Sequence, residues 1–115
     1  MRALSRFVPP LALMAVIFAF SAQPDLDTGL GAFDLVLRKL VHMVEYGLLW
    51  WLWWRALGYE KPGVAAAIAI AYAVSDEFHQ SFVEGRVGSP VDVLIDSAGV
   101  AIAWRLAELR ASRAR

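Results

Sequence analysis

Four long apolar segments separated by short polar stretches constrain the fold of this 115-residue chain more than any other feature. They cover residues 7–22, 40–57, 63–83 and 90–109. A membrane-spanning helix needs about 20 residues, within a range of roughly 17–25, and the last three segments reach that length once interfacial residues are included. We therefore predict an all-α polytopic membrane protein, a bundle of about four transmembrane helices that forms one domain over residues 1–115.

Composition favours the same class of protein. Apolar residues make up 59% of the chain, and five Trp and six Phe would be hard to bury in a soluble domain of this size. The net charge is zero, so no charge excess indicates a nucleic-acid partner. The absence of Cys excludes disulfides and thiolate metal sites. The expected partner is the lipid bilayer.

The first segment has a second interpretation. Arg2 and Arg6 before a short apolar run resemble a secretory signal peptide, and Ala19-Phe20-Ser21 resembles a cleavage site. However, three more apolar segments follow, which a secreted soluble domain would not carry. We favour an uncleaved first span.

The distribution of basic residues predicts the orientation. With the amino terminus inside, the cytoplasmic side holds Arg2, Arg6, Arg55, Lys61, Arg105, Arg110, Arg113 and Arg115, whereas the other side holds Arg38, Lys39 and Arg86. Cytoplasmic loops carry the excess of Lys and Arg. Both termini are therefore expected in the cytoplasm.

Polar residues inside three of the segments are expected to meet in one layer near the outer face. Given a rise of about 1.5 Å per residue, His42 to Tyr46 lie roughly 5–10 Å below Lys39, and Asp76 and Asp96 reach a similar depth. Ionisable residues inside a membrane are costly and are usually functional. The candidate catalytic residues are His42, Glu45, Asp76, Glu77, His79, Asp92 and Asp96. The candidate substrate-binding residues are Lys39, Tyr46, Gln80 and Arg86.

Structural roles are alternatives for several of these residues. Ser89-Pro90-Val91-Asp92 has the form of a helix N-terminal capping box. Lys39 and Arg86 are also suited to anchoring helix ends at the interface, and the side chain of Glu77 is long enough to reach the surface.

Two kinds of ligand fit the layer. Carboxylates crowded at low dielectric either hold protons or bind a cation, and His42, Glu45, Asp76 and His79 offer mixed nitrogen and oxygen ligands for a metal. Their spacing matches no established zinc motif. Alternatively, the outer N-termini of the second and fourth segments favour anions, so that Lys39 and Arg86 would hold a phosphate of an anionic lipid or envelope precursor.

The motifs of these segments, taken in order, resemble the VanZ-like family of small membrane proteins. They are Phe20-Ser21-Ala22-Gln23-Pro24, Lys39-x-x-His42-x-x-x-Tyr46, Asp76-Glu77-x-His79-Gln80-x-Phe82-x-x-Gly85-Arg86 and Asp92-x-x-x-Asp96-x-x-Gly99. The family pattern often has Asn where Asp96 stands. The resemblance implies a bacterial inner-membrane protein, and the name-giving members are associated with low-level resistance to the glycopeptide teicoplanin. It assigns no reaction.

Three functions are compatible with this pattern. The first is an enzyme, an acid–base hydrolase or transferase, acting on a lipid-linked or phosphate-bearing envelope substrate. The second is a non-catalytic accessory protein that binds lipid or glycopeptide. The third, an ion or proton path, is disfavoured because the charged layer does not continue into the inner half of the segments. We rank the enzyme first.

Overall fold

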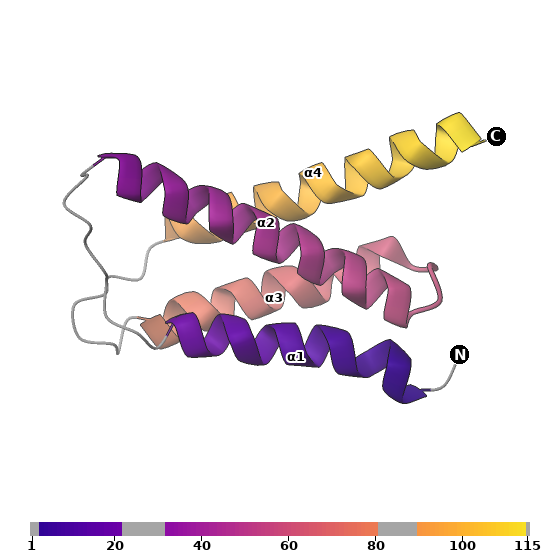
Figure 1. The fold of residues 1–115 in the computed structure, drawn as a ribbon, viewed down its shortest axis with the longest axis horizontal. Helices are drawn as coiled ribbons and strands as arrows, with labels where there is room; N and C mark the ends of the chain where they lie inside the picture. Colours follow the sequence, from indigo (N-terminus) through magenta and orange to yellow (C-terminus); the bar gives the residue numbers. More distant parts are fainter. Residues whose placement is uncertain (1–2, 22–31, 81–89, 115) are drawn as a thin grey trace.

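The computed structural model describes residues 3–21, 32–80 and 90–114, which form four helices and no strand. They are α1 (Ala3–Ser21), α2 (Ala32–Ala56), α3 (Pro62–Gln80) and α4 (Pro90–Ala114). The helices run side by side in alternating directions, so that α1 begins and α4 ends at the same end of the bundle (Figure 1). The predicted all-α fold with four helices is confirmed.

Three helices extend several residues beyond their predicted bounds, and α1 is one of them, since it begins at Ala3 rather than at residue 7. Helix α2 begins at Ala32 rather than at residue 40, and α4 continues to Ala114 rather than ending at residue 109. The predicted segments ended where charged residues begin, but Arg, Lys, Glu and Ala are good helix formers. The apolar segments therefore underestimated the helices, because charge ends a hydrophobic run without ending a helix.

Gly58 ends α2 in a defined way. Its φ of 76° lies in the left-handed region, and its amide donates to the carbonyl of Arg55 at 3.0 Å. The amide of Tyr59 donates to the carbonyl of Trp54 at 2.9 Å. These two bonds form a Schellman cap, in which glycine is favoured because it adopts a positive φ without strain.

Two prolines lie inside α1, and one of them creates a link to α2. Pro9 has no N–H, so the carbonyl of Ser5, four residues earlier, lacks its helical donor. The guanidinium of Arg55 donates to that carbonyl at 2.9 Å. The proline pair therefore does not end the helix, and α2 supplies a hydrogen bond that the backbone of α1 does not make.

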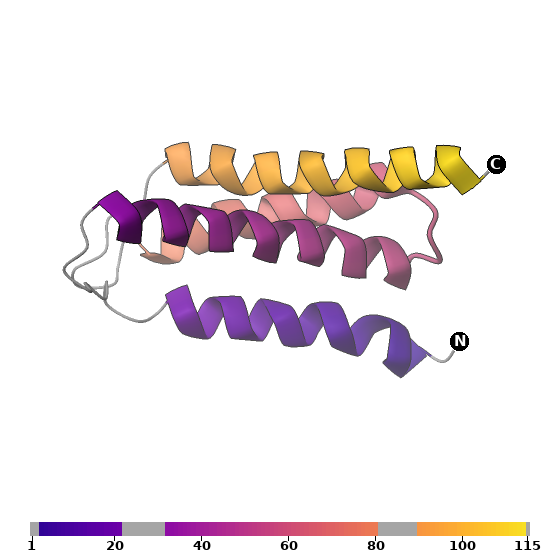
Figure 2. The same cartoon turned by 45° about the horizontal axis from the view of Figure 1, so that its top comes forward.

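Helix α2 is central, and α1 is the most peripheral helix. Among the described residues, α2 contacts the other three helices, whereas α1 contacts only α2 and α3 (Figure 2). The buried core lies mainly between α2, α3 and α4 and consists of Ile17, Tyr46, Leu49, Trp50, Ala65, Ala66, Ala69, Ala73 and Val100.

Two glycines lie where the backbones of α2 and α4 approach each other. A Cβ atom on Gly99 would overlap the backbone of Met43, and one on Gly47 would lie 3.0 Å from the carbonyl oxygen of Gly99. Small residues permit this approach of two backbones. The approach brings the beginnings of α2 and α4, which carry most of the candidate site residues, against each other.

Within the three described ranges, no helix combines the length and apolar character needed to cross a membrane. The polytopic part of the predicted fold class is therefore not confirmed.

Candidate functional site

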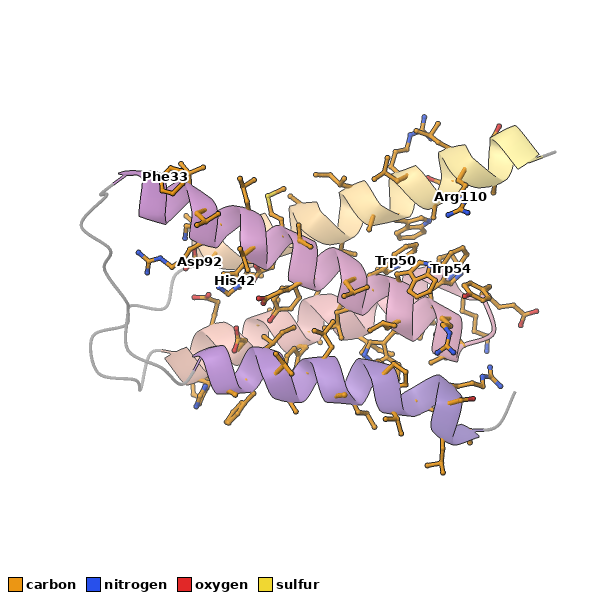
Figure 3. The ribbon with its side chains drawn as sticks, viewed as in Figure 1. Phe33, His42, Trp50, Trp54, Asp92 and Arg110 are labelled. Atoms are coloured by element: carbon orange, nitrogen blue, oxygen red, sulfur yellow. The ribbon has the colours of Figure 1, made fainter. Side chains whose placement is uncertain are left out.

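Charged side chains from α2, α3 and α4 gather at the end of the bundle where α2 and α4 begin and α3 ends. Figure 3 places His42 and Asp92 near this end, while Trp50 and Trp54 lie toward the other end. We call Lys39, His42, Glu45, Tyr46, Asp76, Glu77, Asp92 and Asp96 the acidic layer.

Two pairs join α2 to α4 within the acidic layer. The ammonium of Lys39 donates to the carboxylate of Asp92, and both side chains are partly exposed. One turn deeper, Nδ1 of His42 lies 3.6 Å from Oδ1 of Asp96. Residues three or four apart lie on the same face of a helix. Both pairs therefore form because this face of α2 packs against α4. The carboxylate of Asp92 thus serves an interhelix pair, whereas Ser89 of the predicted capping box lies outside the described residues.

A third contact joins α2 to α3. The hydroxyl of Tyr46 donates to Oδ2 of Asp76 at 3.4 Å, a long hydrogen bond. Tyr46 is fully buried, and Asp76 is only 3% exposed. The rings of His42 and Tyr46 lie nearly parallel, with centroids 6.5 Å apart. These contacts place His42 and Tyr46 on α2 between the acids of the two neighbouring helices.

Asp96 lies at the centre of the negative charge. It is 1% exposed, and the carboxylates of Glu77, Asp76, Asp92 and Glu45 all act on it by Coulombic repulsion. Glu77 is itself only 8% exposed, so the expectation that its side chain could reach the surface is wrong. Burying several carboxylates together is costly unless some of them hold protons or pair with cations. Such a group is suited to giving and receiving protons.

The mixed metal site expected from His42, Glu45, Asp76 and His79 is not formed. Across the described ranges, no three His, Asp or Glu side chains are placed to hold a metal ion. One of the four, His79, stacks instead on Phe18 of α1. Sequence spacing gave these four residues a common depth, but it did not determine which neighbour each one faces.

His79 and Tyr72 belong to the α1–α3 contact. The imidazole of His79 stacks on Phe18, with centroids 4.3 Å apart and planes inclined by 22°. The hydroxyl of Tyr72 donates to the backbone carbonyl of Met14 at 2.5 Å. Sequence reasoning missed both α1 partners, because a phenyl ring and a main-chain carbonyl carry no polar signal in a sequence.

Two predicted binding residues are not placed. Gln80 ends α3, but its side chain lies outside the described residues, as does the whole of Arg86. Lys39, the other predicted phosphate ligand, is paired with Asp92. The predicted phosphate site therefore remains a prediction.

The VanZ/LLP1 family profile matches residues 5–110, nearly the full length. This chain belongs to the VanZ/LLP1 family. The comparisons with curated proteins and with solved structures returned no match. All residues of the acidic layer lie within the range matched by the VanZ/LLP1 profile, so the resemblance seen in the motifs is confirmed. Membership connects the chain to a bacterial family that is generally membrane-associated, and it assigns neither a substrate nor a reaction.

Proposed function

We propose that this VanZ/LLP1 protein is an integral protein of the bacterial inner membrane that performs acid–base chemistry on a lipid-linked or phosphate-bearing envelope substrate at the outer face. The observation that carries the proposal is the burial of Asp76 and Asp96, from two helices, beside Tyr46 and His42 of a third. Buried acids that meet a histidine and a tyrosine are typical of proton transfer.

The membrane location is supported by the surface of the bundle. All four helices carry large apolar side chains that are more than half exposed, among them Leu4, Leu11, Val44, Phe78, Leu94 and Leu106. Single exposed apolar residues are normal on a soluble protein, but large exposed apolar surfaces mark sites of interaction with a membrane or another protein. In a membrane, lipid chains would surround these side chains, so that they would not be exposed to water.

The chemical roles follow from the contacts. Asp96 is placed to orient the imidazole of His42, which then accepts or donates a proton, and Asp76 with Tyr46 forms a second proton-carrying pair. His79, stacked on Phe18, is assigned a supporting role. The sequence analysis placed His79 among the candidate catalytic residues, so its supporting role here is a change from that prediction.

The test measures turnover of bacterial envelope lipids by the purified protein in lipid nanodiscs, with products identified by mass spectrometry. General acid–base groups contribute about 10²–10⁴-fold, so Asp76→Asn and His42→Gln should each lower the rate by at least about a hundredfold. The control variant is Glu60→Gln, which alters an exposed acid in the α2–α3 connection. Unchanged rates in both folded site variants would refute the proposal.

A non-catalytic binder is the second candidate, and the burial of the acids favours it. Asp76 and Asp96 are almost inaccessible, whereas Lys39 and Asp92 form a partly exposed mouth at which a polar group could rest without proton transfer. In that case lipid or glycopeptide binding should weaken in Lys39→Met, and no product should form. Turnover of any envelope lipid would eliminate this candidate.

A further inference from the structure

A hollow lies near the other end of the bundle from the acidic layer (Figure 3). It has a volume of about 320 Å³ and is lined by Trp54, Pro62, Trp104, Ala107, Glu108, Ala111 and Ser112. Ala107 and Ala111 lie one turn apart on α4, and their small side chains leave room beside the two indoles. We call this hollow the tryptophan pocket. None of its lining residues belongs to the acidic layer.

The aromatic lining of the tryptophan pocket is held in place by a buried third indole. Trp50 stacks on Trp54, with centroids 5.2 Å apart and planes inclined by 17°, and on Trp104 at 6.0 Å and 18°. Trp50 is itself fixed, because its Nε1 donates to the carbonyl of Pro62 at 3.1 Å. The two lining rings are therefore positioned before any ligand arrives, which reduces the entropic cost of binding.

Among the described residues that line the pocket, one is charged, and its charge is negative. Glu108 carries the carboxylate, and its nearest described cation is Arg105, with Nη1 3.9 Å from Oε1. Both side chains are mostly exposed, so this pair contributes little and is easily exchanged. A carboxylate beside indole rings favours the binding of a cation that also carries apolar groups.

We propose that the tryptophan pocket binds an organic ammonium group of the choline or ethanolamine type. Indole faces attract ammonium groups through the ring quadrupole, and tryptophan is the strongest of the aromatic side chains in this respect. Glu108 supplies the opposite charge, and the volume suits a small head group at the lower end of the range for ligand sites. A free amine and the head group of a zwitterionic lipid share this chemistry.

The test is a ligand-observed NMR titration of choline with the purified full-length protein in a non-ionic detergent. Saturable binding is expected, and Glu108→Gln should weaken it about threefold, because the mutation removes a carboxylate that is mostly exposed and therefore screened by water. Glu60→Gln, which removes an exposed acid outside the pocket, should change nothing. Because Glu108 is exposed, its substitution is not expected to affect folding.

The same titration with 3,3-dimethylbutanol, a neutral molecule of the shape of choline, separates charge recognition from simple apolar filling. Weak or absent binding of the neutral compound supports the proposal. Equal binding of the two compounds overturns it, as does unchanged choline affinity in Glu108→Gln or the absence of saturable binding. Trp104→Leu, checked for folding by circular dichroism, should also weaken choline binding.

A second arm identifies the source of the ammonium group. In nanodiscs of phosphatidylcholine the head groups should compete with added choline, whereas in nanodiscs of phosphatidylglycerol they should not. Competition in the first and none in the second identifies a lipid head group as the ligand. Equal choline binding in both identifies a free amine. The result does not depend on turnover in the acidic layer, since the two sites share no residue.

Discussion

At the scale of single residues, the acidic layer differs from an ordinary set of surface charges in how its members are buried. Lys39 and Asp92 pair at the partly exposed mouth, whereas Asp76 and Asp96 lie beneath it and are almost inaccessible. Lys39 and Asp92 are more buried than Arg105 and Glu108, so a member of the first pair that loses its partner retains more of its desolvation cost. Pairing at the mouth should therefore matter more for stability than pairing on the open surface of α4.

Lys39→Met tests this difference. The substitution leaves Asp92 without its cation and should lower the free energy of unfolding by about 1–3 kcal/mol. Lys39→Met combined with Asp92→Leu should lose less than Lys39→Met alone, because no charge then remains unpaired. The matched control is Arg105→Met, which breaks the exposed Arg105–Glu108 pair and should cost less than about 1 kcal/mol. Denaturant unfolding followed by circular dichroism measures all three, and equal losses in Lys39→Met and Arg105→Met would contradict the assignment.

At the scale of the helices, two glycines determine how closely α2 and α4 approach. Gly99 faces the backbone of Met43, and Gly47 faces Gly99 and Ala103. Met43 adjoins His42 in the sequence, so a wider α2–α4 spacing would also separate His42 from Asp96. The glycine positions are therefore linked to the site through the helix spacing.

A graded series of Gly→Ala variants is expected from this packing. Gly99→Ala should destabilise the fold most, by about 1–3 kcal/mol, because the added Cβ overlaps backbone that cannot rotate away. Gly47→Ala should cost less, since its nearest contact would be 3.0 Å. Gly63→Ala is the control: its Cβ would meet only Trp104 at 4.0 Å, and alanine favours the helix, so stability should be unchanged or slightly higher. Thermal unfolding monitors the series, and a loss in Gly63→Ala as large as that in Gly99→Ala would show that the spacing is not decisive.

At the scale of the whole molecule, α1 begins and α4 ends at the same end of the bundle (Figure 1). The acidic layer lies toward the other end, where α2 and α4 begin. If the bundle crosses the inner membrane as proposed, both termini lie on one side and the acidic layer lies near the opposite face. In that arrangement, the excess of Lys and Arg near the two termini and around the α2–α3 connection would place the termini on the cytoplasmic side.

Reporter fusions test this arrangement. Green fluorescent protein fused after Arg115 should fluoresce, and alkaline phosphatase at the same point should be inactive, because that point is expected in the cytoplasm. Alkaline phosphatase fused within residues 23–31, between α1 and α2, should be active. The opposite pattern would reverse the orientation, and fractionation of the untagged chain with soluble proteins would refute the membrane location.

The sequence by itself determined the number of helices, their approximate places and the common depth of the charged residues. These properties are local, because the rise of a helix and the order of residues along it place side chains at a known level. The sequence also carried enough of the VanZ-like motifs for the family to be recognised before the fold was known. Helix ends were less well determined, as the early start of α2 at Ala32 shows.

Only the tertiary structure decided which side chains face one another. His42, Asp76 and His79 were expected in one site, but His42 lies near Asp96, Asp76 accepts a hydrogen bond from Tyr46, and His79 stacks on Phe18. The tryptophan pocket was not foreseen, because it joins residues of α2 and α4 that are about fifty positions apart in the sequence. The physical reason is that the rotation and spacing of a helix against its neighbours depend on packing across the bundle, at contacts such as Gly99 on Met43, and no local sequence pattern encodes that packing.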